Sequence, residues 1–205
     1  SIAMGRRGGA FQPHCSHTIM QRCVVMPKMT DTEVAAFLAE RRHLLRVATV
    51  DADGMPRNVP IWYIIDANRI VFTPRLHSVF LANMMRNPRV GLTIDEADLP
   101  YRKVTVQGFA ELLHPPGADD EWRDLYRAIA ARYVSQEAAD DYVLNTIDQP
   151  RALLGVALDE ATSRVSCWRM PVGDEAASGI WARRYFLDGT AMAAVADGDT
   201  PTSRT

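Results

Sequence analysis

The sequence predicts a mainly β domain, a small closed or partly closed barrel of roughly six or seven antiparallel strands with a few short helices. Short runs of β-branched and aromatic residues recur along the chain, and turns of about two to four residues join several of them. Such short turns can link only antiparallel neighbours. Helical spacing of apolar residues is confined to short segments between these runs.

The expected elements follow the chain in order. The first helix begins at Thr30, because Thr30 and Glu33 have the spacing of a capping box, and it ends near Arg42. The expected helices are 30–42, 78–86, 119–133 and 136–145. The expected strands are 45–50, 57–65, 70–73, 89–95, 102–113, 152–158 and 164–168.

Length and composition indicate one soluble domain with extensions. The chain has 205 residues, of which 47% are hydrophobic and 23% charged, and its net charge is −2. This balance gives no electrostatic drive toward nucleic acid or an anionic membrane, and no apolar run is long enough to span a bilayer. Three cysteines, an odd number, favour a reducing compartment. We therefore expect a cytoplasmic protein without nucleic-acid or membrane partners.

The domain is expected at 29–190, after a leader or tag-like extension at 1–28 and before a polar tail at 191–205. The leader holds four possible zinc ligands, His14, Cys15, His17 and Cys23. Their spacing is crowded and lacks a Cys-x-x-Cys pair, so no metal site is predicted.

The motifs of common enzyme mechanisms are missing. The sequence has no Gly-x-Ser-x-Gly elbow, no Walker loop and no His-Glu-x-x-His helix. A chain without an evident nucleophile, base or metal site is either no enzyme or relies on the reactive atoms of a cofactor. Three segments favour the second interpretation.

The first segment is the strand around 57–63, where Arg57 precedes an apolar and aromatic run. This combination suits a ligand with a phosphate at one end and a flat ring system at the other. The alternative is that Arg57 is solvated and Trp62 belongs to the core.

The second segment, 73–78, leads from a strand into a helix N-terminus, where unsatisfied backbone N–H groups favour an anion. Thr73 and Ser78 add hydroxyl donors, and Arg75 adds a planar guanidinium that can bind phosphate through two hydrogen bonds. The alternative is an ordinary N-cap beside a surface arginine.

The third segment is the strand at 103–108. Lys103, Thr105 and Gln107 share one face of this strand and form a row of donors, and Gly108 permits close approach of a backbone or a ring. The alternative is a polar face that is simply solvated.

Taken together, these segments resemble the pyridoxamine 5′-phosphate oxidase-like flavin-binding split-barrel superfamily. The resemblance covers roughly residues 30–168 and rests on the order of short motifs at 46–56, 59–63, 72–75, 87–90 and 104–108. It implies a six-stranded antiparallel split β-barrel with an N-terminal helix. It also implies a homodimer that binds FMN, or alternatively the deazaflavin F420, at the dimer interface.

The resemblance further implies which residues bind the cofactor. The phosphate cradle matches Arg57, Thr73, Arg75 and Ser78, and the strand beside the flavin ring matches Val59, Pro60, Ile61 and Trp62. Lys103 and Gln107 stand where the oxidases commonly have Gln and Glu. Many members carry a lysine just after the cradle, where this chain has Val79 and Phe80. The helical insertion at 119–145 is expected to cover one mouth of the site.

The function predicted on this basis is hydride transfer between the bound FMN or F420 and a small unsaturated molecule. No residue is predicted to be catalytic, and the candidate proton sources are solvent, Tyr63 and His77. One alternative is a non-catalytic module that binds a flavin, haem or tetrapyrrole, and another is an empty barrel that serves oligomerisation. Cys167 is expected to be structural or incidental.

Overall fold

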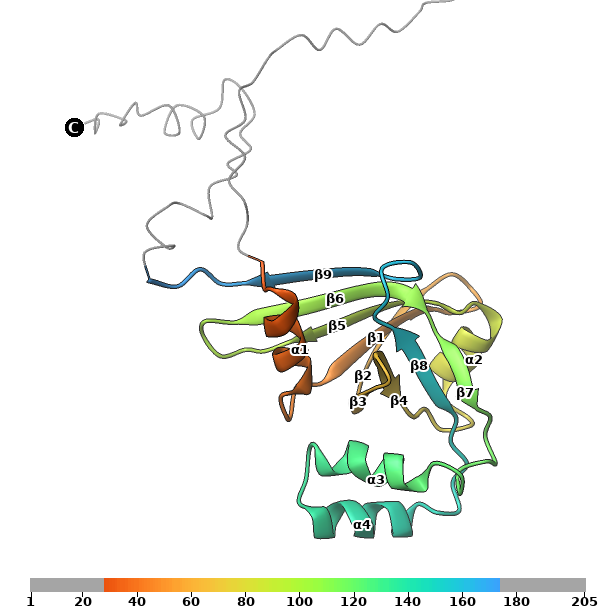
Figure 1. Ribbon diagram of the computed structural model, residues 1–205. Helices are drawn as coiled ribbons and strands as arrows, with labels where there is room; N and C mark the ends of the chain where they lie inside the picture. Colours follow the sequence, from red (N-terminus) through yellow and green to blue (C-terminus); the bar gives the residue numbers. More distant parts are fainter. Residues whose placement is uncertain (1–27, 174–205) are drawn as a thin grey trace, which may run out of the picture. The chain divides into compact units, whose positions relative to one another are not determined.

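The computed structural model describes residues 28–173 of the chain. The strands of this region form two antiparallel β-sheets (Figure 1). The five-stranded sheet has the order β2-β1-β5-β6-β9, and the four-stranded sheet has the order β3-β4-β8-β7. The strands are β1 Leu45–Val50, β2 Pro56–Ile61, β3 Tyr63–Asp66, β4 Arg69–Phe72, β5 Arg89–Asp95, β6 Arg102–Phe109, β7 Glu111–His114, β8 Leu153–Ala157 and β9 Arg164–Arg169. The helices are α1 Asp31–Ala39, α2 Val79–Arg86, α3 Arg123–Ala131 and α4 Gln136–Asn145. The predicted mainly β class with short helices is confirmed.

Two of the predicted strands divide between the sheets. The predicted strand 57–65 is β2 in the five-stranded sheet and β3 in the four-stranded sheet, with Trp62 at the break. The predicted strand 102–113 divides in the same way into β6 and β7 at Ala110. A strand that passes from one sheet to another has to bend at the corner. Residues 28–173 therefore contain nine strands, more than the roughly six or seven expected for a small barrel.

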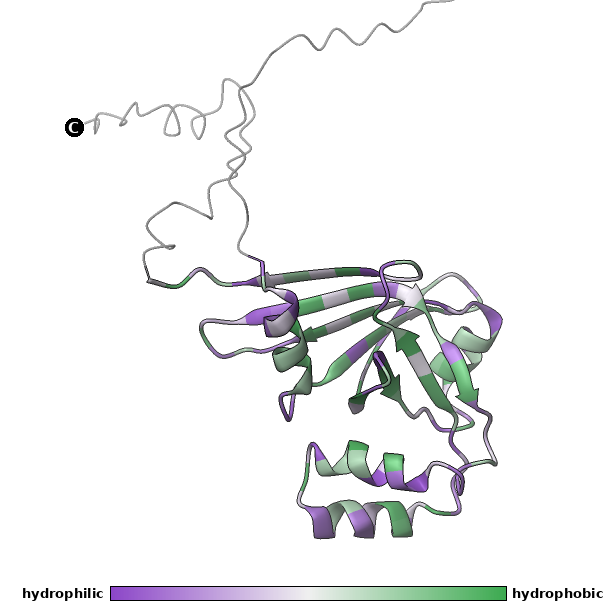
Figure 2. Cartoon of the chain, in the orientation of Figure 1, coloured by the Kyte–Doolittle hydropathy of each residue, from purple (hydrophilic) through white to green (hydrophobic). Residues whose placement is uncertain are grey.

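The core fills the space between the two sheets. Alternate residues of the central strands are buried, as with Leu45 and Val47 in β1 and Leu92 in β5. Figure 2 shows this alternation as green and paler bands along the strands. The outward neighbours, such as Ala48, are exposed. The five-stranded sheet thus has one buried face and one exposed face, as is common for antiparallel sheets.

Helix α1 starts where the sequence predicts and ends earlier. The Glu33 backbone N–H donates to Thr30 Oγ1 at 3.3 Å, and the Thr30 N–H donates to Glu33 Oε2 at 2.7 Å, which confirms the capping box. The helix ends at Ala39 because Glu40 has an extended backbone. The Glu40 carboxylate accepts two hydrogen bonds from Arg102, which fixes the chain at this point.

Helices α3 and α4 pack on the four-stranded sheet through a second hydrophobic cluster. Its buried members are Val71, Trp122, Tyr126, Val143 and Leu153. Helix α3 begins only at Arg123, since the residues before it form turns instead of the expected helical start. The cluster attaches both helices to β4 and β8, beside the loop that follows β4.

Three remaining expectations concern a membrane-spanning helix, the two ends of the chain, and Cys167. No helix within residues 28–173 has both the length and the apolar character needed to cross a bilayer. The possible zinc ligands of the leader and the polar tail lie outside these residues. Cys167 is a half-buried free cysteine on β9, and its Sγ lies 3.3 Å from the carbonyl oxygen of Met29.

Candidate functional site

A cavity of about 330 Å³ opens where the break between β2 and β3 meets the loop after β4 and the two helices α3 and α4. Its lining consists of Val59, Pro60, Ile61, Trp62, Thr73, Pro74, Arg75, Ser78, Phe80, Tyr126, Tyr142 and Arg151. Small-molecule sites typically have volumes of about 300–1,000 Å³. The lining contains two arginines and no carboxylate, so the cavity carries an uncompensated positive charge.

The fold brings seven of the ten predicted cofactor-binding residues to this cavity. They are Val59, Pro60, Ile61, Trp62, Thr73, Arg75 and Ser78. Five further lining residues were not predicted, namely Pro74, Phe80, Tyr126, Tyr142 and Arg151. The expected contribution of the helical insertion is present, since Tyr126 lies on α3 and Tyr142 on α4.

Arg57 is not brought to the cavity, contrary to the expected convergence with Arg75. Its Nε and Nη2 donate to the two carboxylate oxygens of Asp51 at 2.7 and 2.6 Å. Asp51 also accepts from Asn83 Nδ2 at 2.6 Å, and these hydrogen bonds lower the pKa of Asp51 to about 2. The antiparallel pairing of β1 with β2 places Arg57 next to the turn that contains Asp51. The Asp51 carboxylate therefore joins Arg57 of β2 to Asn83 of helix α2.

Lys103 and Gln107 also lie away from the cavity, on the exposed face of the five-stranded sheet. The Lys103 Nζ lies 5.9 Å from the centre of the Trp168 ring. Gln107 lines a separate depression of about 640 Å³ with residues of β1, β5 and the 160–164 segment. A Cβ atom on Gly108 would lie 2.6 Å from Ser163 Oγ, so it is this serine, and not a ligand, that requires the glycine.

Ser78 precedes α2 as predicted, but its side chain does not cap the helix. The Ser78 hydroxyl donates instead to the carbonyl oxygen of Arg75 at 2.7 Å. The first backbone N–H groups of an α-helix have no partner inside the helix. At α2 these groups lack a side-chain cap and belong to the segment that borders the cavity.

Aromatic rings form one wall of the cavity. Trp62 stacks on Tyr133 with a centroid distance of 5.1 Å and an interplanar angle of 6°. The edge of Tyr142 meets Trp62 at 5.4 Å, and Tyr126 lies 5.9 Å from Tyr142. Flat rings can stack on such side chains. Trp62, at the break between β2 and β3, therefore packs against the helical pair.

Arg151 was not predicted from the sequence, and it adds a second guanidinium to the cavity. It is only 6% exposed. Its Nη1 donates to the Thr73 carbonyl and its Nη2 to Tyr142 Oη, both at 3.2 Å. Its guanidinium lies 4.6 Å from the centre of the Tyr126 ring. No local pattern marks Arg151 in the sequence, because its neighbours in the cavity come from distant segments.

The sequence matches the pyridoxamine 5′-phosphate oxidase family over residues 30–164, which is more than half of the chain. The chain belongs to the pyridoxamine 5′-phosphate oxidase family. No curated protein matches it. Within the described residues, the match covers α1 through the start of β9 and every residue that lines the cavity.

Solved structures share the fold of this pyridoxamine 5′-phosphate oxidase family member. The conserved hypothetical protein Rv2991 from Mycobacterium tuberculosis has a TM-score of 0.56 and 20% identity, over 85% of this chain and 99% of that one. HutZ, the haem storage protein from Vibrio cholerae, has a TM-score of 0.50 and 18% identity, over 66% and 94%. The FAD and haem binding protein from Mycobacterium smegmatis has a TM-score of 0.50 and 17% identity, over 79% and 89%. At these identities the likeness establishes the fold.

The two cavity tyrosines of this oxidase family member differ in their electrostatics. Burial raises the pKa of Tyr126 to about 12. Burial also raises the pKa of Tyr142, but the hydrogen bond to Tyr126 and the charge of Arg151 outweigh it, so the pKa of Tyr142 is lowered. Tyr142 is thus the lining hydroxyl that loses a proton more readily.

Neither predicted proton source lines the cavity. Tyr63 is completely buried, and its hydroxyl donates to the carbonyl oxygen of Leu38 at 3.0 Å. Burial raises the pKa of Tyr63 far above its ordinary value, so its hydroxyl stays protonated. His77 is exposed and lies outside the lining.

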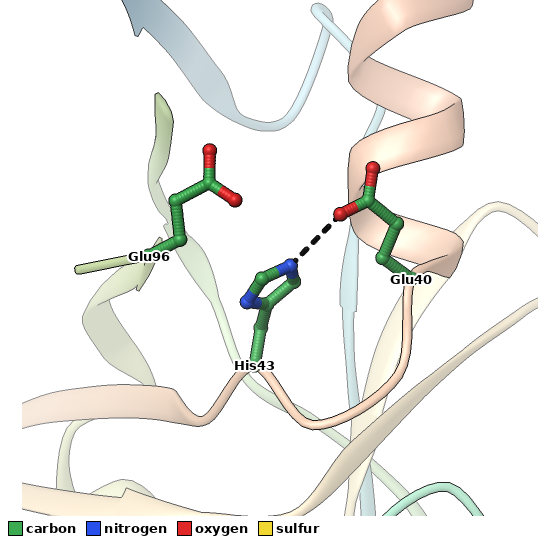
Figure 3. A group of neighbouring side chains, drawn as sticks. All are labelled: Glu40, His43 and Glu96. Atoms are coloured by element: carbon green, nitrogen blue, oxygen red, sulfur yellow. Dashed lines mark hydrogen bonds and ion pairs between the residues drawn. The ribbon is translucent and has the colours of Figure 1, made fainter. Parts of the chain in front are cut away.

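A second polar cluster lies at the end of α1, where Glu40, His43 and Glu96 point toward one another (Figure 3). One ligand atom from each lies within 4.8 Å of the others, a spacing that could suit a metal ion. Arg102 already satisfies both carboxylates, with hydrogen bonds of 2.8 and 2.8 Å to Glu40 and 2.5 and 2.7 Å to Glu96. These bonds lower the pKa of both glutamates. A cation would have to displace the guanidinium, so the cluster is a structural ion network.

Proposed function

We propose that this chain binds a flavin, FMN or alternatively F420, in the cavity beside Trp62 and acts as an oxidoreductase on a small unsaturated molecule. The observation that carries the proposal is the composition of the lining. A flat apolar strand segment and aromatic rings lie together with two guanidinium groups, and no carboxylate opposes them. A ligand with a flat ring system and a phosphate matches both halves of this surface.

The residues present fit such a cofactor. Val59, Pro60, Ile61 and Trp62 offer apolar area to a ring. The segment at 73–78 offers Arg75, the Thr73 hydroxyl and uncapped N–H groups of α2 to a phosphate. When bound, a flavin or deazaflavin supplies hydride transfer, which needs no protein nucleophile.

The contributions of the protein are binding, orientation and the exclusion of water. The lining has no Asp, Glu, His or Cys, so Tyr142 is the titratable lining group placed to hold or release a proton. Its lowered pKa suits that role better than the high pKa of Tyr126.

A second candidate function is binding without turnover, since HutZ is described as a haem storage protein and the Mycobacterium smegmatis protein as binding FAD and haem. The cavity lining contains no His, Cys or Met, three of the four side chains that commonly ligate haem iron. The remaining type, tyrosine, is present only as Tyr126 and Tyr142, and both hydroxyls already make hydrogen bonds. These features favour a flavin over a haem in this cavity.

Absorption and fluorescence titrations with FMN and with F420 test the binding proposal. Saturable binding of FMN or of F420 supports the proposal. If neither cofactor binds, the proposal is contradicted. Steady-state oxidation of a reduced nicotinamide or of reduced F420 with an electron acceptor then separates an oxidoreductase from a binding module. A saturated but inert protein would favour the binding module.

We also propose that the chain forms a homodimer through the exposed face of the five-stranded sheet. Val50 and Phe109 on this face are 50% and 51% exposed, and the small residues Ala48 and Gly91 lie between them. A second copy would cover this apolar area. Light scattering at micromolar concentration should show a dimer, and Gly91→Glu should shift it toward monomer. A monomeric wild-type protein would contradict the proposal.

A further inference from the structure

Arg151 carries a buried positive charge that has no carboxylate partner. Among the Lys, Arg, Asp and Glu residues of 28–173, Arg151 alone is buried, with 6% of its surface exposed. A guanidinium has five N–H donors, and the structure gives that of Arg151 two hydrogen bonds. Its Nε is buried without a hydrogen-bond partner. Burying a charge in this way is costly unless an anion compensates it.

Three other arginines in the described region, Arg69, Arg132 and Arg169, also bury an Nε without a hydrogen-bond partner, but their surroundings differ from those of Arg151. Arg169 is only half-buried and lines a depression that also contains the carboxylates Glu96 and Asp98. Arg69 forms an ion pair with Glu111 at 3.3 Å. Arg132 donates to three backbone carbonyls at the end of α1, at distances of 2.7 to 3.1 Å. Arg151 has none of these arrangements, and it lies in the wall of a cavity whose lining contains no carboxylate. Its unsatisfied donor capacity therefore points to a ligand.

A second arginine, Arg75, lies beside Arg151 in the wall of the cavity. The backbones of Arg75 and Arg151 form an isolated antiparallel bridge, so both side chains leave the chain at one place in the cavity wall. Neither arginine forms an ion pair within the described residues. Two guanidinium groups without carboxylates form a site suited to phosphate, because each can donate two parallel hydrogen bonds to it.

We propose that Arg151 is a phosphate-binding residue and forms, with Arg75, the cationic end of the cavity. This inference rests on the proposed function, in which the ligand carries a phosphate, and it assigns that phosphate to a residue outside the predicted cradle. Arg57 is unsuited to the role because Asp51 already occupies its guanidinium.

The helical pair orients Arg151 for this role. Tyr142 on α4 accepts from Nη2, the Tyr126 ring on α3 covers the guanidinium, and the Thr73 carbonyl accepts from Nη1. In addition, the Arg151 backbone N–H donates to Asp119 Oδ2 at 2.8 Å. The insertion therefore does more than cover the cavity, because it positions one of the phosphate-binding groups.

The test compares FMN with riboflavin, which has the same ring system and no phosphate. Arg151→Ala should weaken FMN binding by roughly ten- to a hundredfold and leave riboflavin binding within about threefold. Arg151→Lys should lie between, since it keeps the charge and loses the planar fork. Arg127→Ala is the matched control, because this arginine lies on α3 and pairs with acidic side chains outside the cavity. Arg57→Ala should leave the preference for FMN over riboflavin unchanged.

The proposal would be overturned if Arg151→Ala weakened the binding of FMN and of riboflavin equally. It would also be overturned if Arg57→Ala reduced the preference for FMN over riboflavin more than Arg151→Ala does. If Arg151→Ala does not fold, Arg151→Lys and Tyr142→Phe decide the question, with circular dichroism as the check on folding. Tyr142→Phe removes one hydrogen-bond partner of Arg151 and should weaken FMN more than riboflavin.

A titration with inorganic phosphate, followed by ³¹P NMR, separates this inference from the proposed function. If no flavin binds but phosphate binds to the wild type and more weakly to Arg151→Lys, the phosphate site stands and the flavin proposal fails. If the wild type binds neither probe, or if the Arg151 variants bind phosphate as well as the wild type does, the role of Arg151 is refuted.

Discussion

Arg102 and Arg151 have similar aromatic surroundings and very different anionic ones. The Arg102 guanidinium lies 4.7 Å from the centre of the Phe37 ring, and that of Arg151 lies 4.6 Å from the centre of the Tyr126 ring. Arg102 donates to both Glu40 and Glu96, whereas Arg151 donates to a carbonyl and a phenol. The protein supplies the counter-charge in the first region and leaves it out in the second.

The comparison separates structural arginines from those that can bind a ligand. Arg102 makes four hydrogen bonds to carboxylates, and the resulting network joins the end of α1 to the β5–β6 hairpin. Arg57 and Asp51 form a similar pair at the β1–β2 turn. An arginine that is buried beside a cavity without such a partner favours an incoming anion.

The largest effect is expected from giving Arg151 its own carboxylate. Tyr142→Glu places an acid on α4 at the position whose hydroxyl now accepts from Arg151. The new carboxylate should occupy the guanidinium and repel phosphate, so FMN affinity should fall by about a hundredfold or more. Fluorescence titration measures this change. Tyr142→Gln is the uncharged control and should lose less; an equal loss in the two variants would show that charge is not the cause.

The opposite test removes the Arg102 guanidinium from its network with Glu40 and Glu96. Arg102→Ala leaves Glu40 and Glu96 facing each other and should lower the free energy of unfolding by about 1–2 kcal/mol, a modest value because the side chain is 31% exposed. Urea unfolding measures it. FMN affinity should stay within about threefold, since the network lies outside the cavity. A loss of FMN binding without a loss of stability would contradict this separation.

Acid should weaken the paired networks. Hydrogen bonds from Arg102 lower the folded-state pKa of Glu40 and Glu96 from 4.5, and Arg57 lowers that of Asp51 from 3.8 to about 2. A lowered carboxylate pKa stabilises the fold above the unfolded-state pKa, and this contribution is lost as the pH falls through the folded-state value. The urea midpoint should therefore decline between about pH 5 and pH 2. Arg102→Ala should show a shallower decline, and an identical slope would exclude Arg102 as its source.

The smallest effect is expected at Cys167. Its thiol contacts the Met29 carbonyl, and Cys167 is not among the residues that line the cavity. Cys167→Ala should leave FMN affinity within about threefold, or about 0.7 kcal/mol. Isothermal titration calorimetry measures it. A larger loss would mean that the thiol contacts the ligand.

Much of the fold and part of the site could be predicted from local patterns. The predicted bounds of β1, β5 and α4 are those of the structure, because alternation, helical spacing and turn residues act within a few positions. The segments at 59–62 and 73–78 reach the same cavity, because the first contains the end of β2 and the second follows the end of β4. The breaks at Trp62 and Ala110 could not be predicted, since a strand changes sheets only where two sheets have to close on each other.

Local sequence patterns are enough to show which segments become strands and where α1 begins. They also show that the segments at 59–62 and 73–78 are available for a ligand. Which arginine is free to bind that ligand depends on contacts between segments that are distant in sequence. The sequence predicts Arg57 as readily as Arg75, but the β1–β2 pairing gives Arg57 to Asp51. Arg151 reaches the cavity through contacts with α3, α4 and the end of β4. Whether a charge is paired or left unsatisfied depends on neighbours that are distant in sequence, and local periodicity carries no information about them.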